Sequence, residues 1–476
     1  MQTPLEHTYA AAVPELSVPW PAEKPPRPEI VWLNEELARE LGYDPQQLRS
    51  EDGIALLTGQ IDGTVAQAYA GHQFGTPNPQ LGDGRAVLLG ERVDPAGRRH
   101  DLHLKGAGRT PFARGGDGKA PLGPMLREAV IGEWLHALGV PTTRALAVVS
   151  TGEQIAPRQG VTPEPGALLL RVAASHLRVG TFEHAAWHLD PEVRERLVEY
   201  TLTRHHPSAD GPLALLDAVT GAQAELVAQW MLAGFVHGVM NTDNMALSGE
   251  GIDYGPCAVL DEHRRGAVFS SIDRGGRYAY GNQPGIALWN LSRFAETLVE
   301  LIDPGQPNSA VDAATEVLEG FEARYLEAHA RGLARKLGIP SASSEEVRGL
   351  GDDLFVLLEQ QTVDHTMFFR ALAEGGAEGL FNESDPYRAW VSRLEPLRGG
   401  DGQADDAAAA MLNANPIYIP RNVHLDAALR AAHLGDLEPV RVLLDAVSDP
   451  FTRRTGLEHL EGPGNGGEHF LTFCGT

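Results

Sequence analysis

Residues 237–244 read HGVMNTDN, and this stretch decides the predicted fold. An apolar, helix-like pattern precedes it and predicts a long helix that ends near Met240 and delivers the last residues as a loop. Asp243 and Asn244 close the stretch, and Asp253 follows nine residues later in GIDYGP. Carboxylate and amide oxygens are suited to hold Mg²⁺ against nucleotide phosphates. Asn244 and Asp253 therefore predict a metal site formed by two loops.

The same stretch differs at one position from the loop of kinase-like phosphotransferases. Many of those enzymes carry HGDxxxxN, in which the Asp is the catalytic base and the Asn holds a metal. His237, Gly238 and Asn244 fit this pattern, but Val239 stands at the position of the base. A valine cannot accept a proton from a hydroxyl. Three interpretations stay open: an inactive kinase, a chance match, or an enzyme that transfers a different part of ATP.

A glycine turn before a strand pattern is the first upstream feature of interest. Gly82 and Gly84 form a Gly-x-Gly turn in LGDGRAVLLGE, and Arg85 adds a cation. Glycines let the backbone approach a phosphate closely. The third glycine of a full nucleotide loop would fall at Val87 and is missing, so this turn taken alone favours a plain hairpin turn over a phosphate loop.

A lysine at the end of a strand pattern is the second feature. In DLHLKG, alternation places Leu102 and Leu104 on one face, and His103 and Lys105 on the other. Lys105 matches the phosphate-gripping lysine of a kinase, and Glu128 on the following helix is its candidate partner. A surface lysine and an exposed helix face are the alternatives.

Two arginines and a second glycine-rich loop complete the set of candidates. Arg171 and Arg178 lie seven apart after a strand pattern and predict a phosphate clamp, with ion-paired surface arginines as the alternative. Asp117 and Gly118 lie in the polar loop RGGDGKA.

The order of the predicted elements favours an α+β protein with a kinase-like, two-lobed fold. The patterns from 86 to 173 run strand, strand, helix, strand, strand, and helical patterns dominate from about 185 onward. We expect four parts: an N-terminal extension (1–75), a small β-rich lobe (76–170), a large helical lobe with the active site (171–340) and a helical C-terminal region (341–476).

Composition limits the partners that the chain can bind. The 476 residues carry a formal net charge of −25, which repels nucleic acid and anionic lipid. No apolar run is long enough to span a bilayer, and the N-terminus has no signal-peptide pattern, so we expect a cytoplasmic protein without nucleic-acid or membrane partners. The two cysteines, Cys257 and Cys474, cannot form a disulfide framework.

Several longer motifs resemble the selenoprotein O family of pseudokinases. They are YAGHQFG, PQLGDGRA, LKGAGRTPFARGGDGKA, GVPTTRALAVV, MNTDNM, IDYGP, RYAYGNQP and NPIYIPRN, and the likeness runs from about residue 69 to 422. The resemblance implies a kinase-like fold that binds ATP in a flipped orientation. It implies transfer of AMP, or of UMP from UTP, to Ser, Thr or Tyr hydroxyls of proteins, with Mg²⁺ or alternatively Mn²⁺. A reversed nucleotide would account for Val239, because it brings the α-phosphate to the reaction centre.

The resemblance also implies a role for each matching residue. Asp243 is the proton acceptor, Asn244 and Asp253 hold the metal, and Glu128 pairs with Lys105. The residues implied to contact the nucleotide are Gly82, Gly84, Arg85, Lys105, Asp117, Gly118, Arg171, Arg178 and Asp253. The segment REAVIGEWL departs from the usual family sequence but retains Glu128, and Cys474 suggests a redox link with Cys257 as its partner.

Two other functions remain possible from the residues themselves. The first is an ordinary phosphotransferase that uses Asp243 as its base, against which Val239 argues. The second is a non-catalytic nucleotide-binding scaffold, against which the intact Lys105, Asn244 and Asp253 argue.

Overall fold

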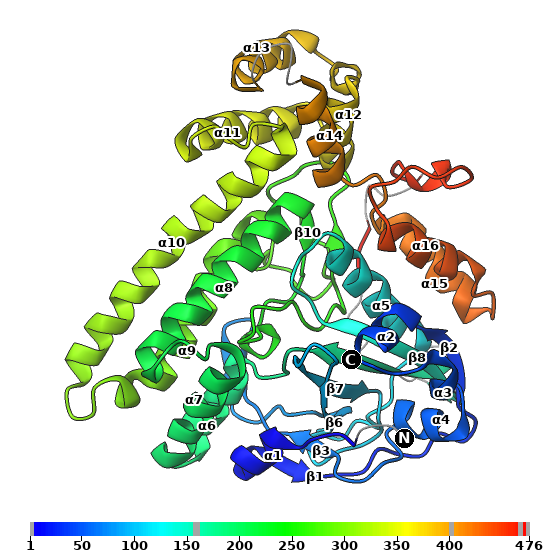
Figure 1. Cartoon of the computed structure of the whole chain (residues 1–476), viewed down its shortest axis with the longest axis vertical. Helices are drawn as coiled ribbons and strands as arrows, with labels where there is room; N and C mark the ends of the chain where they lie inside the picture. The colour runs from blue at the N-terminus through cyan, green and yellow to red at the C-terminus, as the bar shows by residue number, and fades with distance from the viewer. Residues whose placement is uncertain (1–3, 156–161, 399–403, 465–469, 473–476) are drawn as a thin grey trace.

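The computed structural model describes residues 4–155, 162–398, 404–464 and 470–472. A seven-stranded sheet lies at one end of the molecule, a group of four helices at the other, and long helices connect the two (Figure 1). The described helices include none that is both long and apolar enough to cross a membrane.

The large sheet has the order β1-β3-β6-β7-β9-β8-β2, and every neighbouring pair is antiparallel. Its strands are β1 (Ser17–Pro19), β2 (Glu29–Leu33), β3 (Val65–Gln67), β6 (Ala86–Val93), β7 (Arg99–Lys105), β8 (Arg144–Ile155) and β9 (Glu164–Ala173). Helix α5 (Leu122–Ala137) lies between β7 and β8 in the chain, so the predicted order of strand, strand, helix, strand, strand is confirmed. The α+β class is confirmed with it. Three strands come from the first 75 residues, which therefore complete the sheet.

Alternation along the strands divides the sheet between two apolar cores. Leu102 and Leu104 face a core that they share with α2 (Glu35–Glu40), α3 (Pro45–Leu48) and α4 (Glu51–Leu57). The opposite face packs on α5. His103 and Lys105 alternate with these leucines, as predicted, and belong to the face that carries the polar site.

Helices make up most of the chain after the sheet. They are α6 (Val179–His188), α7 (Pro191–His205), α8 (Gly211–Ala233), α9 (Gln283–Ile302), α10 (Pro307–Leu337), α11 (Ser344–Gln360), α12 (His365–Glu374), α13 (Ser384–Leu394), α14 (Ala404–Ala414), α15 (Asn422–His433) and α16 (Glu438–Ser448). The remaining elements include α1 (Thr8–Ala12), the hairpin β4 (Gly71–Gln73) and β5 (Thr76–Asn78), and the short pair β10 (Phe235–Val236) and β11 (Ala258–Val259).

The prediction that the helix before HGVMNTDN ends near Met240 is wrong. Helix α8 ends at Ala233, because Gly234 takes the left-handed conformation (φ +67°) that ends many helices. Phe235 and Val236 then form β10. The apolar run continued past the helix end in the sequence because β10 is buried as completely as the helix.

Helix α10 belongs to two cores. Ala314 and Phe321 lie in the large core, with α8 and α9. Leu333 and Leu337 lie in a second core, which α11 to α14 complete. Figure 1 shows α10 running from the central helices to the group of four at the far end.

Candidate active site

Four charged side chains meet at the polar face of the sheet. Lys105 ends β7, and its Nζ lies 2.7 Å from Glu128 Oε2 of α5 and 2.7 Å from Asp253 Oδ1. Arg171 of β9 lies beside it, with Nη1 3.1 Å from Glu128 Oε1 and 2.6 Å from Asp253 Oδ1. The predicted pair of Lys105 and Glu128 therefore forms, and the alternatives of a surface lysine and an exposed helix face are wrong.

Asp253 is held in an unusual position by this cluster. Its φ of +64° is left-handed, which costs a non-glycine residue about 1–2 kcal/mol. Arg178 Nη1 lies 3.7 Å from its second oxygen, Oδ2. Burial alone would raise the pKa of Asp253, but Lys105, Arg171 and Arg178 hold it well below its usual value. Asp253 is therefore a carboxylate among three cations.

Arg171 and Arg178 are buried, not surface arginines. Arg171 Nη2 lies 2.9 Å from His103 Nδ1, and Arg178 stacks over the ring of Tyr69 with its guanidinium carbon 4.3 Å from the centroid. Arg171 Nε and Arg178 Nη2 are buried without a hydrogen-bond partner among the described residues. A buried donor without a partner is costly, so both atoms suit an anionic ligand.

Asp243 has the properties of a proton acceptor. Its Oδ1 is buried with no hydrogen-bond partner in the described part of the chain. Burial raises the pKa of Asp243 to about 7, and the nearby Arg178 offsets part of that rise. Gly71 makes room for the carboxylate, because a Cβ there would lie 2.7 Å from Oδ1. A pKa near the operating pH is the value that suits a general base.

The loop that carries Asp243 is fixed by residues that sequence reasoning missed. Thr242 Oγ1 donates to Glu183 Oε2 of α6 at 2.6 Å and accepts from the backbone N of His72 at 2.6 Å. His72 Nδ1 also lies 2.5 Å from Glu183 Oε1. Asn241 Oδ1 accepts from the Tyr278 hydroxyl at 2.7 Å. His72 and Tyr278 lie within the motifs YAGHQFG and RYAYGNQP. No local spacing indicated their role or that of Glu183, because these partners are far apart in the chain.

A chain of contacts from Asp83 through His103 leads to Arg171, and the sequence predicted part of it. His103 Nε2 lies 3.1 Å from Asp83 Oδ2, and the His103 ring stacks on His176 with centroids 4.2 Å apart. Strand alternation predicted that His103 lies on the same face as Lys105, and this was the only indication in the sequence that His103 belongs to the site. Because His103 lies between Asp83 and Arg171, it orients the Arg171 guanidinium.

Asn244 and Asp253 would supply part of a ligand set for a divalent metal. No group of three or more His, Cys, Asp or Glu residues that could hold a metal occurs in the described ranges. Asp253 Oδ1 is shared by Lys105 and Arg171, whereas Oδ2 has only the more distant Arg178. The side-chain nitrogen of Asn244 donates to Val239 O at 2.9 Å, which fixes the amide. One carboxylate and one amide fit a Mg²⁺ ion whose other ligands are substrate phosphates and water.

The glycine turn packs against the loop after β7. Gly82 has a φ of +75°, and a Cβ there would lie 2.3 Å from Phe112 Cγ. Gly84 also lies close to this residue, since a Cβ there would be 2.9 Å from the backbone oxygen of Phe112. The carbonyl of Arg85 accepts from the backbone N of Gly106 at 2.8 Å, directly after Lys105. The turn therefore lies at the end of β7, beside the ion cluster.

Asp117 and Gly118 lie farther out. Gly118 O accepts from Gly108 N at 3.1 Å, which joins the loop to the segment after Lys105. Asp117 is exposed, and its carboxylate accepts from Lys119 N at 3.0 Å. Of the contacts described, none joins Asp117 to the ion cluster, so its role toward a nucleotide stays a prediction.

Gly82→Ala is expected to lower the unfolding free energy by at least about 2 kcal/mol, because strain at positive φ adds to the clash with Phe112. Gly97→Ala is the matched control. Gly97 has a φ of +83° but open space around its Cβ, so its loss should be about 1 kcal/mol. Urea unfolding of both variants measures the difference, and equal losses would show that Phe112 yields freely.

The hypothesis of a link between Cys257 and Cys474 stays open. Cys257 is buried, and burial raises the pKa of its thiol to about 12. Thr472 Oγ1 donates to the carbonyl of Pro256, the residue that precedes Cys257, at 2.6 Å. Cys474 lies outside the described residues. Unchanged activity with and without dithiothreitol would end the hypothesis.

Comparison with known proteins places this chain in a family. The chain matches the family model described as "Protein adenylyltransferase SelO" over residues 3–447. It is 50% identical to a protein nucleotidyltransferase YdiU of Pseudarthrobacter chlorophenolicus, over 98% of this chain and 97% of the relative. Relatives with the same name from a Mycobacterium species and from Cereibacter sphaeroides are 51% and 50% identical, over 99% of each chain. The chain therefore belongs to the SelO family of protein adenylyltransferases and is a nucleotidyltransferase.

Proposed function

We propose that this nucleotidyltransferase moves AMP from ATP to Ser, Thr or Tyr hydroxyls of proteins, with ATP bound in a flipped orientation. The observation that carries the proposal is the buried Asp243, four residues after the non-basic Val239. Its Oδ1 has no hydrogen-bond partner among the described residues. A general base is present in the loop, but it is displaced from the position that a kinase uses.

Each residue of the site has a role in this proposal. Asp243 takes the proton of the attacking hydroxyl. The hydroxyl oxygen forms a bond to the α-phosphorus, the bond from that phosphorus to the bridging oxygen breaks, and diphosphate leaves. Lys105, Arg171 and Arg178 offset the charge of the triphosphate. Gly82, Gly84, Arg85, Asp117 and Gly118 are assigned to nucleotide contacts.

Asn244 and Asp253 are the residues that would hold the metal. A bound Mg²⁺, or Mn²⁺ in its place, neutralises phosphate charge and orients the triphosphate. Glu128 keeps Lys105 in position through the 2.7 Å ion pair. UTP as a donor of UMP belongs to the same chemistry.

The proposal includes a kinase-like arrangement of two lobes. The β-rich part that carries Lys105 and Glu128 and the helical part that carries Asp243 and Asp253 meet at the ion cluster, which supports it. The four-part division at residues 75, 170 and 340 is proposed with it, although the strands of the first part complete the sheet of the second and the boundary at 170 falls within β9. Protein acceptors and a cytoplasmic location are likewise proposals.

Paired labelling tests the function. Purified protein, Mg²⁺ and a generic protein acceptor receive ATP labelled at the α-phosphate or at the γ-phosphate. We expect acceptor labelled from the α-phosphate alone. Label from the γ-phosphate alone would mean an ordinary phosphotransferase that uses Asp243. No label from either position, with ATP binding intact, would mean a nucleotide-binding scaffold.

A further inference from the structure

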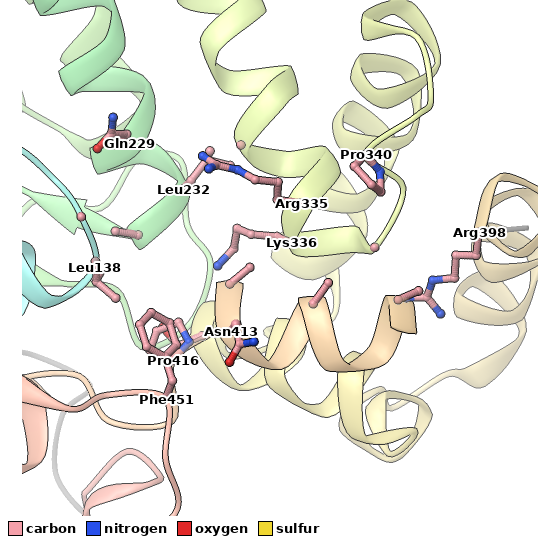
Figure 2. A pocket seen from close by; sticks show the side chains of 18 of the residues that line it. Leu138, Gln229, Leu232, Arg335, Lys336, Pro340, Arg398, Asn413, Pro416 and Phe451 are labelled. Atoms are coloured by element: carbon pink, nitrogen blue, oxygen red, sulfur yellow. The ribbon is translucent and has the colours of Figure 1, made fainter. Parts of the chain in front are cut away.

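A cavity of about 1060 Å³ lies where the C-terminal ends of α8 and α10 meet α14, and its described lining includes no residue of the ion cluster (Figure 2). Its wall is mostly apolar and includes Leu138, Leu232, Pro416 and Phe451. Polar and charged side chains are the minority of the lining, as is usual for sites that bind small molecules. They are Gln229, Arg335, Lys336, Ser341, Thr366, Arg398 and Asn413. The cavity is large enough for a ligand of drug size.

The charges around the cavity have one sign. Arg335, Lys336 and Arg398 line it, and the described lining residues include no Asp or Glu. This is unexpected in a chain with 64 acidic and 39 basic residues. The cavity is therefore electrostatically suited to an anion, in a protein whose net charge otherwise repels anions.

Lys336 is the charged group that lacks compensation. The residue is 8% exposed, and its Nζ has neither a carboxylate nor a hydrogen-bond partner among the described residues; its one partner is the Phe369 ring, 4.4 Å from Nζ to the centroid. Figure 2 shows the side chain leaving α10 toward the cavity. Burial lowers the pKa of Lys336 to about 7, as expected when a buried ammonium lacks a counter-ion.

The other charged groups near Lys336 do not supply that counter-ion. His365 of α12 faces it, but burial, His263 and Lys336 itself hold the pKa of His365 well below its usual value, so the ring is neutral. Arg398 already pairs with Glu395, with Nη1 3.1 Å from Oε1. Arg335 is exposed, so water solvates its charge.

We propose that this cavity binds a small amphiphilic carboxylate, whose anionic head pairs with the Lys336 ammonium and whose apolar body fills the space between α8, α10 and α14. One buried ammonium calls for one negative charge, and the apolar wall calls for an apolar body. A phosphate would bring more charge into the apolar interior than Lys336, the buried lining cation without a counter-ion among the described residues, can balance. This inference goes beyond the proposed function and does not depend on it.

Isothermal titration with octanoate tests the proposal. We expect one octanoate per chain, and binding weakened at least about ten-fold by Lys336→Met, which keeps the apolar stem and removes the charge. Octan-1-ol should bind at least about ten-fold more weakly than octanoate. Arg331→Met is the matched control, because Arg331 lies on the same helix but pairs on the exposed surface with Glu225, and it should bind octanoate as the parent protein does.

Three results would overturn the proposal. They are no heat of binding with octanoate, equal affinity in Lys336→Met, and inorganic phosphate binding as tightly as octanoate. A second variant locates the site if Lys336→Met fails to fold. Ala410→Leu keeps the lysine but places a larger side chain on the cavity wall, so it must weaken octanoate binding if the ligand occupies this space.

Discussion

Asp243→Asn is expected to lower AMP transfer by about 10²- to 10⁴-fold, because the amide cannot accept the proton of the attacking hydroxyl. The affinity for ATP should change little, since Asn keeps the shape of the side chain. Single-turnover transfer with α-labelled ATP, together with a nucleotide-binding titration, separates the two effects. Normal transfer by this variant would show that another group is the base.

The pH dependence of stability provides an independent test of the role of Asp243 with the same Asp243→Asn variant. The folded-state pKa of Asp243 is about 7, above its ordinary value of 3.8. Between about pH 4 and pH 7, the folded state therefore holds a proton that the unfolded state has lost. The unfolding free energy of the parent protein falls as the pH rises through this range. Asn cannot ionise, so the variant should be the more stable protein at pH 8 and gain little at pH 4. Thermal unfolding without nucleotide or metal measures this. Lost activity together with lower stability at pH 8 would indicate a structural role instead.

Lys105→Met is expected to lower transfer by about 10²- to 10³-fold, because it removes a preorganised cation from the phosphate site. Arg144→Met is the matched control. Arg144 of β8 pairs with Glu133 of α5 at 2.7 Å, just as Lys105 pairs with Glu128 of the same helix at 2.7 Å. The side chains of Lys105 and Arg144 are 8% and 9% exposed, so both variants break a comparably buried pair.

The two variants should differ in transfer activity, although each loses one buried ion pair between the sheet and helix α5. Breaking a buried ion pair costs up to about 3–5 kcal/mol. Lys105→Met should cost less than this, because Arg171 still contacts both Glu128 and Asp253. Transfer per folded molecule should stay near the parent value in Arg144→Met. If both variants lost transfer equally, the reaction would depend on the correct placement of helix α5 and not on the charge of Lys105.

Only part of the ion cluster could be predicted. Strand alternation placed Lys105 on the polar face of its strand, and the following helix offered Glu128 as its partner. The contacts of Asp253 with Lys105 and Arg171 were not predicted, because they join residues 148 and 82 positions apart in the chain. The support of the Asp243 loop could not be predicted in this way. Glu183 and His72 reach Thr242 from positions 59 and 170 residues away, and only the fold brings them together. The end of α8 was misjudged for a different reason, since Gly234 ends the helix while burial continues through β10.

The 31-residue helix α10, about 46 Å long at 1.5 Å per residue, joins the two apolar cores into one cooperative unit. Helical hydrogen bonds propagate cooperatively, so loss of packing around Leu333 and Leu337 frays the helix toward Phe321 and the large core. The amide hydrogens of α10 should therefore exchange with solvent in one slow group, together with those of the helices that complete the second core. Substitutions that weaken the packing of α11 to α14 should therefore also lower the protection of amide hydrogens against exchange in the large core, which holds the site.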